Sequence, residues 1–184
     1  METTGPARPA RDRAERTPKD ITLSLLVLLV PILLVFGFYR VFLGADEPVA
    51  VDPGPAYEQA GAAGEFPVHA PVGLGPDWVA VSAVFRPSSA ADGPTLRVGY
   101  VTPAGAAVQV VQSSRPAPEL LVAELTATAQ PQGDVAIGAT TWQRYAARPG
   151  ERALVWLAPQ HSVLVVGTAD SDELRLMAEA LTPR

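Results

Sequence analysis

The longest apolar run of the chain lies near its start. Residues 21–39 contain no charged side chain, and after Arg40 the apolar character resumes over residues 41–43. A helix needs roughly 20 predominantly apolar residues to cross a bilayer. The pattern therefore predicts a single transmembrane helix over residues 21–43, embedded in the lipid bilayer.

Two other interpretations of this run are a cleaved signal peptide and a buried core helix. The apolar core of a secretory signal is roughly 7–15 residues, shorter than this run, so an uncleaved signal anchor is favoured. Five basic residues precede the run, whereas Arg40 is the only one after it until Arg86. Because basic residues are retained on the cytoplasmic side, residues 1–20 are predicted to be a disordered cytoplasmic tail and the C-terminal part extracytoplasmic, at the plasma membrane.

Beyond the apolar run, the composition changes twice. Residues 44–55 contain three prolines and three acids, a composition typical of an extended linker. Residues 56–184 are then predicted to form one extracytoplasmic domain, of a length that can bury a single core.

Alternation of apolar and polar residues dominates this predicted domain, and it indicates β-strands. Pro103 and Gly105 occupy the positions that suit a type I turn followed by a bulge, which predicts a hairpin. Trp142 and Trp156 are equally far from Pro149, so a turn centred there would make them cross-strand partners. The predicted strands cover residues 78–85, 96–101, 107–112, 134–138, 140–146, 153–158 and 162–168.

Two segments show helical spacing instead. Residues 119–127 predict a short helix that buries Leu121, Val122 and Leu125. Near the end, Asp170 and Glu173 have the spacing of a capping box. They precede an apolar stripe at helical spacing, formed by Leu174, Met177, Ala178 and Leu181. Strands in runs with two or three helices packed on them predict an α+β fold with a mostly antiparallel sheet.

Composition excludes several classes of function. The chain has 184 residues, a net charge of −5 and no cysteine, so disulfides and thiolate chemistry are excluded. A pI near 5.0 argues against nucleic acid as a partner. His69 and His161 have no second ligand at metal-site spacing and are predicted to be surface residues. The sequence also lacks a G-x-S-x-G nucleophile elbow and the glycine-rich phosphate-binding loops.

The charged residues suggest no catalytic pair. A carboxylate pair could be drawn from six acids, but these fall at predicted turns and helix starts, where solvation and capping account for them. They are Asp77, Asp92, Glu119, Glu124, Asp134 and Glu151. Arg97, Arg144 and Arg152 lie on or near predicted strands and could form a basic face, although ordinary surface charge is favoured. We therefore expect no enzyme activity, no catalytic, metal-binding or cofactor-binding residues, and no cofactor.

Seven short stretches that span most of the chain carry a family resemblance: residues 16–20, 66–68, 70–71, 73–78, 96–103, 141–145 and 165–169. Together they resemble an actinobacterial-type membrane protein family, the domain of unknown function number 4245. The resemblance implies a single-pass envelope protein with an outer α+β domain and no assigned activity or functional residues. A weaker likeness, over the second half alone, is to the extracytoplasmic sensor domains of anti-sigma factors.

Three functional hypotheses follow. The first is a non-catalytic, membrane-anchored interaction or ligand-sensing module of the cell envelope, with an envelope protein as a partner to be considered. The second is a structural subunit of a membrane complex, and the third is an envelope hydrolase that uses carboxylates.

Overall fold

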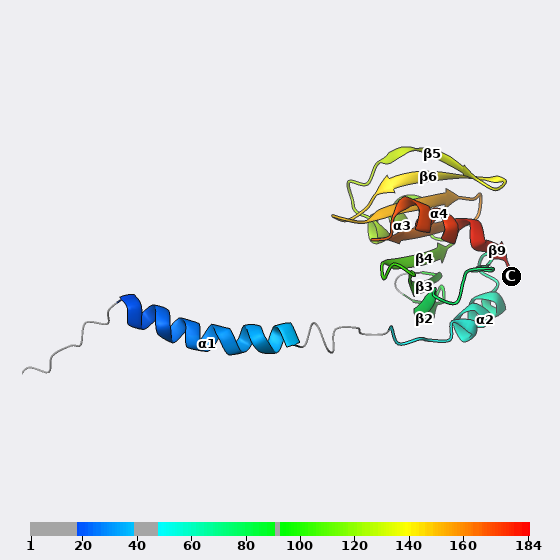
Figure 1. The fold of residues 1–184 in the computed structure, drawn as a ribbon. Helices are drawn as coiled ribbons and strands as arrows, with labels where there is room; N and C mark the ends of the chain where they lie inside the picture. The colour runs from blue at the N-terminus through cyan, green and yellow to red at the C-terminus, as the bar shows by residue number, and fades with distance from the viewer. Residues whose placement is uncertain (1–17, 39–47, 91–92) are drawn as a thin grey trace, which may run out of the picture. The chain divides into compact units, whose positions relative to one another are not determined.

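The computed structural model describes residues 18–38, 48–90 and 93–184 (Figure 1). The chain divides into two compact units, Met1–Glu47 and Pro48–Arg184. The predicted cytoplasmic tail up to residue 17, residues 39–43 of the predicted span and residues 44–47 of the predicted linker lie outside the described residues.

Helix α1, Pro18–Phe38, is the element described in the first unit, and Pro31 lies inside it. Every large apolar side chain from Leu25 to Phe36 is between 40% and 69% exposed. Among the described residues, no helix combines the length and apolarity of a membrane span.

The second unit is built on a seven-stranded sheet with the order β2-β3-β4-β8-β7-β6-β5, in which every neighbouring pair is antiparallel. The strands are β2 (Val79–Arg86), β3 (Thr95–Val101), β4 (Ala107–Ser113), β5 (Pro131–Ile137), β6 (Thr140–Ala146), β7 (Arg152–Leu157) and β8 (Ser162–Gly167). Each overlaps one of the predicted strands. The α+β class with an antiparallel sheet is thus confirmed for this unit.

The two predicted hairpin features are confirmed as well. Between β3 and β4, the Gly105 amide donates to the Thr102 carbonyl at 2.8 Å, and Gly105 has a φ of 80°, the left-handed value that glycine tolerates. The β6–β7 register pairs Gln143 with Val155, so the next two residues along these strands, Trp142 and Trp156, lie opposite each other. Their ring centroids are 6.0 Å apart.

Three elements were not predicted. Helix α2, Gly54–Ala63, begins inside the segment expected to be a linker, and Gly64 ends it with a φ of 64°. Strands β1 (His69–Pro71) and β9 (Leu181–Pro183) form a separate two-stranded antiparallel sheet. Leu181, predicted as the last buried residue of the final helix, instead begins β9.

Helices α2 and α4 cover one face of the large sheet, which we call the α4 face. Helix α4, Ser171–Ala180, begins as predicted: the Asp170 carboxylate accepts the amides of Asp172 and Glu173, each at 2.9 Å. Its residues Leu174, Met177 and Ala178 are buried against the strand residues that point to this face. Those strand residues include Val98, Val110, Leu154, Val163 and Val165.

The opposite face, which we call the α3 face, carries helix α3, Ala117–Glu124. Leu120 and Leu125 are buried there against Val155 and Leu164. The prediction that Val122 faces the core is wrong, because its side chain is 55% exposed and Leu120 takes its place. The helix begins at Ala117, two residues before the predicted start, and ends at Glu124.

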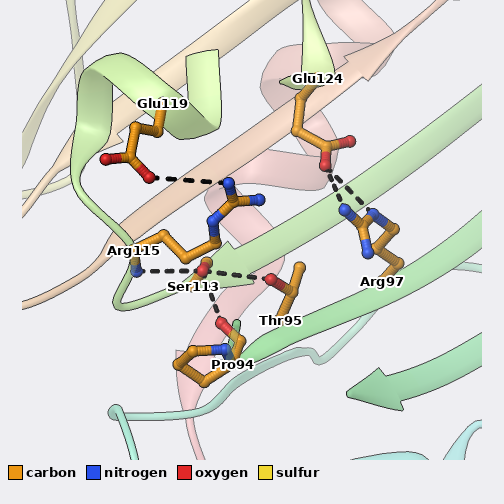
Figure 2. A network of polar contacts seen from close by, with 7 residues as sticks. All are labelled: Pro94, Thr95, Arg97, Ser113, Arg115, Glu119 and Glu124. Atoms are coloured by element: carbon orange, nitrogen blue, oxygen red, sulfur yellow. Dashed lines mark hydrogen bonds and ion pairs between the residues drawn. The ribbon is translucent and has the colours of Figure 1, made fainter. Parts of the chain in front are cut away.

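Polar contacts join α3 to the sheet (Figure 2). Glu124 accepts from Nε and Nη2 of Arg97, at 3.1 and 2.5 Å. Close by, the Ser113 hydroxyl donates to the Pro94 carbonyl and accepts the Arg115 amide, and Arg115 also pairs with Glu119 at 3.7 Å. The Arg97–Glu124 pair therefore joins α3 to the sheet, whereas the Arg115–Glu119 pair lies within the start of the helix.

Candidate functional site

Four rings gather on the α4 face, and we call them the histidine–tryptophan cluster: His69, Trp142, Trp156 and His161. The two imidazoles are stacked, with centroids 5.6 Å apart and planes 14° apart. Trp156 meets both of them edge to face, at 5.2 Å from His69 and 5.4 Å from His161. The cluster joins β1 to β6, β7 and the turn before β8.

Gln112 fixes β1 over the large sheet. Its side chain accepts the His69 amide and donates to the His69 carbonyl, both at 2.7 Å. Gln112 is fully buried and lies on β4, where Val108 and Val110 precede it on the same face. The sequence contained a signal for this contact, since a glutamine stands where the alternation of β4 calls for an apolar residue.

The prediction that both histidines are surface residues is wrong. His69 is 5% exposed and His161 is 8% exposed. Nδ1 of His69 and Nε2 of His161 are buried without a hydrogen-bond partner among the described residues. Burial lowers the pKa of both imidazoles, and for His161 the neighbouring His69 lowers the pKa further. Both rings are therefore neutral at pH 7.

A cavity of about 490 Å³, which we call the aromatic cavity, opens beside this cluster. Trp142 and Trp156 line it from the large sheet, His69 lines it from β1, and Glu179 lines it from the C-terminal half of α4. The described residues contain no group of three or more histidine or carboxylate side chains that could hold a metal ion.

A larger cavity, of about 630 Å³, lies on the same face beside the N-terminal half of α4. We call it the arginine cavity because Arg144 of β6 and Arg152 of β7 line it. Ile137 lines both cavities, so the two are neighbours along α4. The volume is within the range of pockets that take small organic ligands.

The three arginines that the sequence suggested as one basic face are divided between the two faces of the sheet. Arg97 pairs with Glu124 on the α3 face, so it is an ordinary structural charge. Arg144 stands opposite Leu154 in the register, and Leu154 belongs to the core of the α4 face. Within the described part of the chain, neither Arg144 nor Arg152 has an ion pair or a hydrogen bond from its side chain.

Three of the six acids considered for catalysis face arginines. Glu119 pairs with Arg115, Glu124 with Arg97, and Glu151 with Arg148. Asp77 and Asp134 are exposed, and Asp92 lies outside the described residues.

A buried tyrosine pair was also missed by the sequence analysis. The hydroxyls of Tyr57 on α2 and Tyr100 on β3 are 3.0 Å apart, and burial raises the pKa of both. Arg184 lies over the Tyr57 ring at 5.5 Å. These residues line a third cavity of about 410 Å³ with Trp78. Tyr57 was overlooked because α2 itself was not predicted.

Comparison with known proteins gives one match. A family described as "Protein of unknown function (DUF4245)" matches residues 13–181. No curated protein and no solved structure matches the chain.

Proposed function

The chain belongs to the DUF4245 family, which carries no assigned activity, and from that premise we propose that it is a membrane-anchored, non-catalytic ligand-binding module of the cell envelope. In this proposal residues 21–43 hold the chain in the plasma membrane. The N-terminus is cytoplasmic, and the second unit binds its ligand outside the cell on the α4 face.

The anchor is supported by sequence and exposure together. Nineteen consecutive residues, 21–39, carry no charge, and the large apolar side chains of α1 from Leu25 to Phe36 are exposed on all sides of the helix. A helix that is apolar all round requires lipid or protein around it. Fractionation after alkaline carbonate washing tests the anchor, and recovery of the chain in the supernatant would contradict it. A reporter fused after Arg184 that is active only in the cytoplasm would contradict the orientation.

One observation carries the ligand-binding proposal. The arginine cavity combines an apolar floor with two arginine side chains that no described acid neutralises. The cavity of about 630 Å³ is large enough for a small organic molecule, and its lining sets polar and charged side chains beside an apolar patch. On the α3 face, by contrast, the arginines are engaged by glutamates.

Photo-crosslinking in cells tests this proposal. A photoreactive phenylalanine analogue would replace Gln132, which lines the arginine cavity, and Asp134, which lies on the same edge strand and pairs with Gln143. We expect a small-molecule adduct of defined mass at position 132 that is absent at position 134. Equal labelling at both positions, or none at 132, would overturn the proposal, and a protein adduct would favour an interaction module instead.

The exposed apolar surface of α1 favours a second candidate, a structural subunit of a membrane complex. In that case the sequence of the span, rather than its hydrophobicity, is required. Exchange of residues 21–43 for an unrelated membrane anchor would then abolish function. If these residues only attach the chain to the membrane, function should survive the exchange.

A further inference from the structure

Two guanidinium groups are brought to the same side of the β6–β7 hairpin. The register places Arg152 opposite Ala146 and Arg144 opposite Leu154, so the two arginines are diagonal neighbours on the α4 face. Both side chains line the arginine cavity and both residues are exposed. Like charges at this spacing repel each other, and an anion placed between them would relieve the repulsion.

The bulge of β5 leaves room for the Arg144 side chain. The register of β5 against β6 shifts between Pro131 and Asp134, and Gly133 in this bulge has a φ of 126°. A Cβ atom at Gly133 would stand 3.2 Å from Nη2 of Arg144. The glycine therefore lets the guanidinium lie close against the backbone of the edge strand.

The other charges of the lining differ in how closely they are paired. Arg175 pairs with Glu179 at 2.9 Å, whereas Glu151 lies 3.6 Å from Arg148 and its Oε2 atom is buried without a hydrogen-bond partner among the described residues. Asp172 lies in the first turn of α4, where the helix N-terminus stabilises a carboxylate. Among the described lining residues, Arg144, Arg152 and Asp172 have no ion pair, and three arginines against two acids leave the lining with a net positive charge.

The floor of the cavity is apolar. Val135, Ile137, Leu154 and Leu174 line it, and the last three are buried. A bare inorganic ion would leave this floor unused, whereas an organic anion could place its apolar body there and its oxygens toward the guanidinium groups.

We propose that the arginine cavity binds an organic anion, with a carboxylate or phosphate group held by Arg144 and Arg152 and an apolar body over Leu154 and Leu174. This inference rests on the proposed ligand-binding function and adds the chemical class of the ligand. Guanidinium groups suit both kinds of head group, because planar pairs of N–H donors match carboxylate and phosphate oxygens.

Saturation-transfer NMR on the full chain in mild detergent provides the test. Benzoate and benzamide have the same ring, and only benzoate carries a charge. Phenyl phosphate tests the second head group, and inorganic phosphate tests an anion without an apolar body. We expect benzoate or phenyl phosphate to bind about tenfold or more tightly than benzamide, because hydrogen bonds to a charged group are the stronger ones.

The variants Arg144→Gln and Arg152→Gln, singly and together, are expected to remove this preference. Arg86→Gln is the matched control, since it removes the same charge from an exposed position on β2, at the opposite edge of the sheet. The control is expected to keep the affinity within about twofold, because distant exposed charges are largely screened at physiological salt.

The outcomes separate the two proposals. Equal binding of benzoate and benzamide at the cavity would overturn the anion preference and leave a ligand cavity in place. Inorganic phosphate binding as tightly as phenyl phosphate would contradict the role of the apolar floor. Absence of binding by all four probes would overturn the inference, whereas the crosslinking at position 132 tests the ligand-binding function independently. Unchanged benzoate affinity in the double variant would also overturn the inference.

Discussion

The two faces of the large sheet use their charged residues in opposite ways. On the α3 face, Arg97 of β3 pairs with Glu124 of α3 and joins the helix to the sheet, while Arg115, just before α3, pairs locally with Glu119. On the α4 face, Arg144 and Arg152 have no acidic partner among the described residues and border a cavity. An arginine on a strand thus has a structural role where the helix packed on that face places a carboxylate beside it. Where the helix places none, the guanidinium is free to bind a ligand.

The largest effect is expected on the α3 face. Glu124→Gln should lower the unfolding free energy by about 2–3 kcal/mol, because it leaves the partly buried Arg97 without its carboxylate. Thermal and urea unfolding can be followed by tryptophan fluorescence, since all three tryptophans belong to the second unit. A loss below about 0.5 kcal/mol, the usual range for a surface substitution, would show that this pair does not hold α3.

The contact between Gln112 and β1 should come next. Gln112→Ala is expected to cost about 2 kcal/mol, since two buried backbone groups of His69 lose their partners. Gln109→Ala on the same strand, whose side chain points to the α3 face, serves as the control and should change stability little. If both substitutions had the same effect, Gln112 would not be the residue that secures β1.

Acidification should weaken the α4 face through its histidines. Their pKa is lowered by burial in the folded chain and stays near 6.5 in the unfolded chain, so the unfolded state binds more protons just below pH 6.5. Stability is therefore fully present above pH 6.5 and falls as the pH drops toward the folded pKa. His161→Phe keeps a ring in the stack and should flatten this dependence. A profile equally steep in the variant would contradict a role for His161.

A substitution in the bulge of β5 should have a smaller effect on stability and should also change ligand binding in the arginine cavity. Gly133→Ala should cost about 1 kcal/mol, because alanine at a φ of 126° is strained and its Cβ would press on Arg144. The same variant should weaken benzoate binding. Gly105→Ala, also at positive φ and with open space around its Cβ but outside the lining of the arginine cavity, separates backbone strain from displacement of Arg144. Equal loss of benzoate affinity in both variants would count against positioning by Gly133.

Local patterns predicted much of the second unit. The alternation of β2 to β8, the Thr102 turn, the cap at Asp170 and the opposed tryptophans all depend on residues close in sequence or on one hairpin. Strands β1 and β9 were missed because each has three residues and they pair across more than 100 positions. The histidine stack depends on that pairing, so burial of His69 and His161 had no local signal. For the same reason, the separation of Arg97 from Arg144 and Arg152 required the sheet register.

The different use of arginines on the two faces can be tested by comparing the double variant Arg144→Gln/Arg152→Gln with Glu124→Gln, by unfolding and by benzoate titration of the full chain. We expect the double arginine variant to have an unfolding free energy within about 0.5 kcal/mol of the natural chain but to lose the preference for benzoate over benzamide. Glu124→Gln is predicted to be less stable but to keep the preference for benzoate under conditions in which the variant is folded. A double variant that is strongly destabilised, or that still prefers benzoate, would contradict the assignment of the two faces.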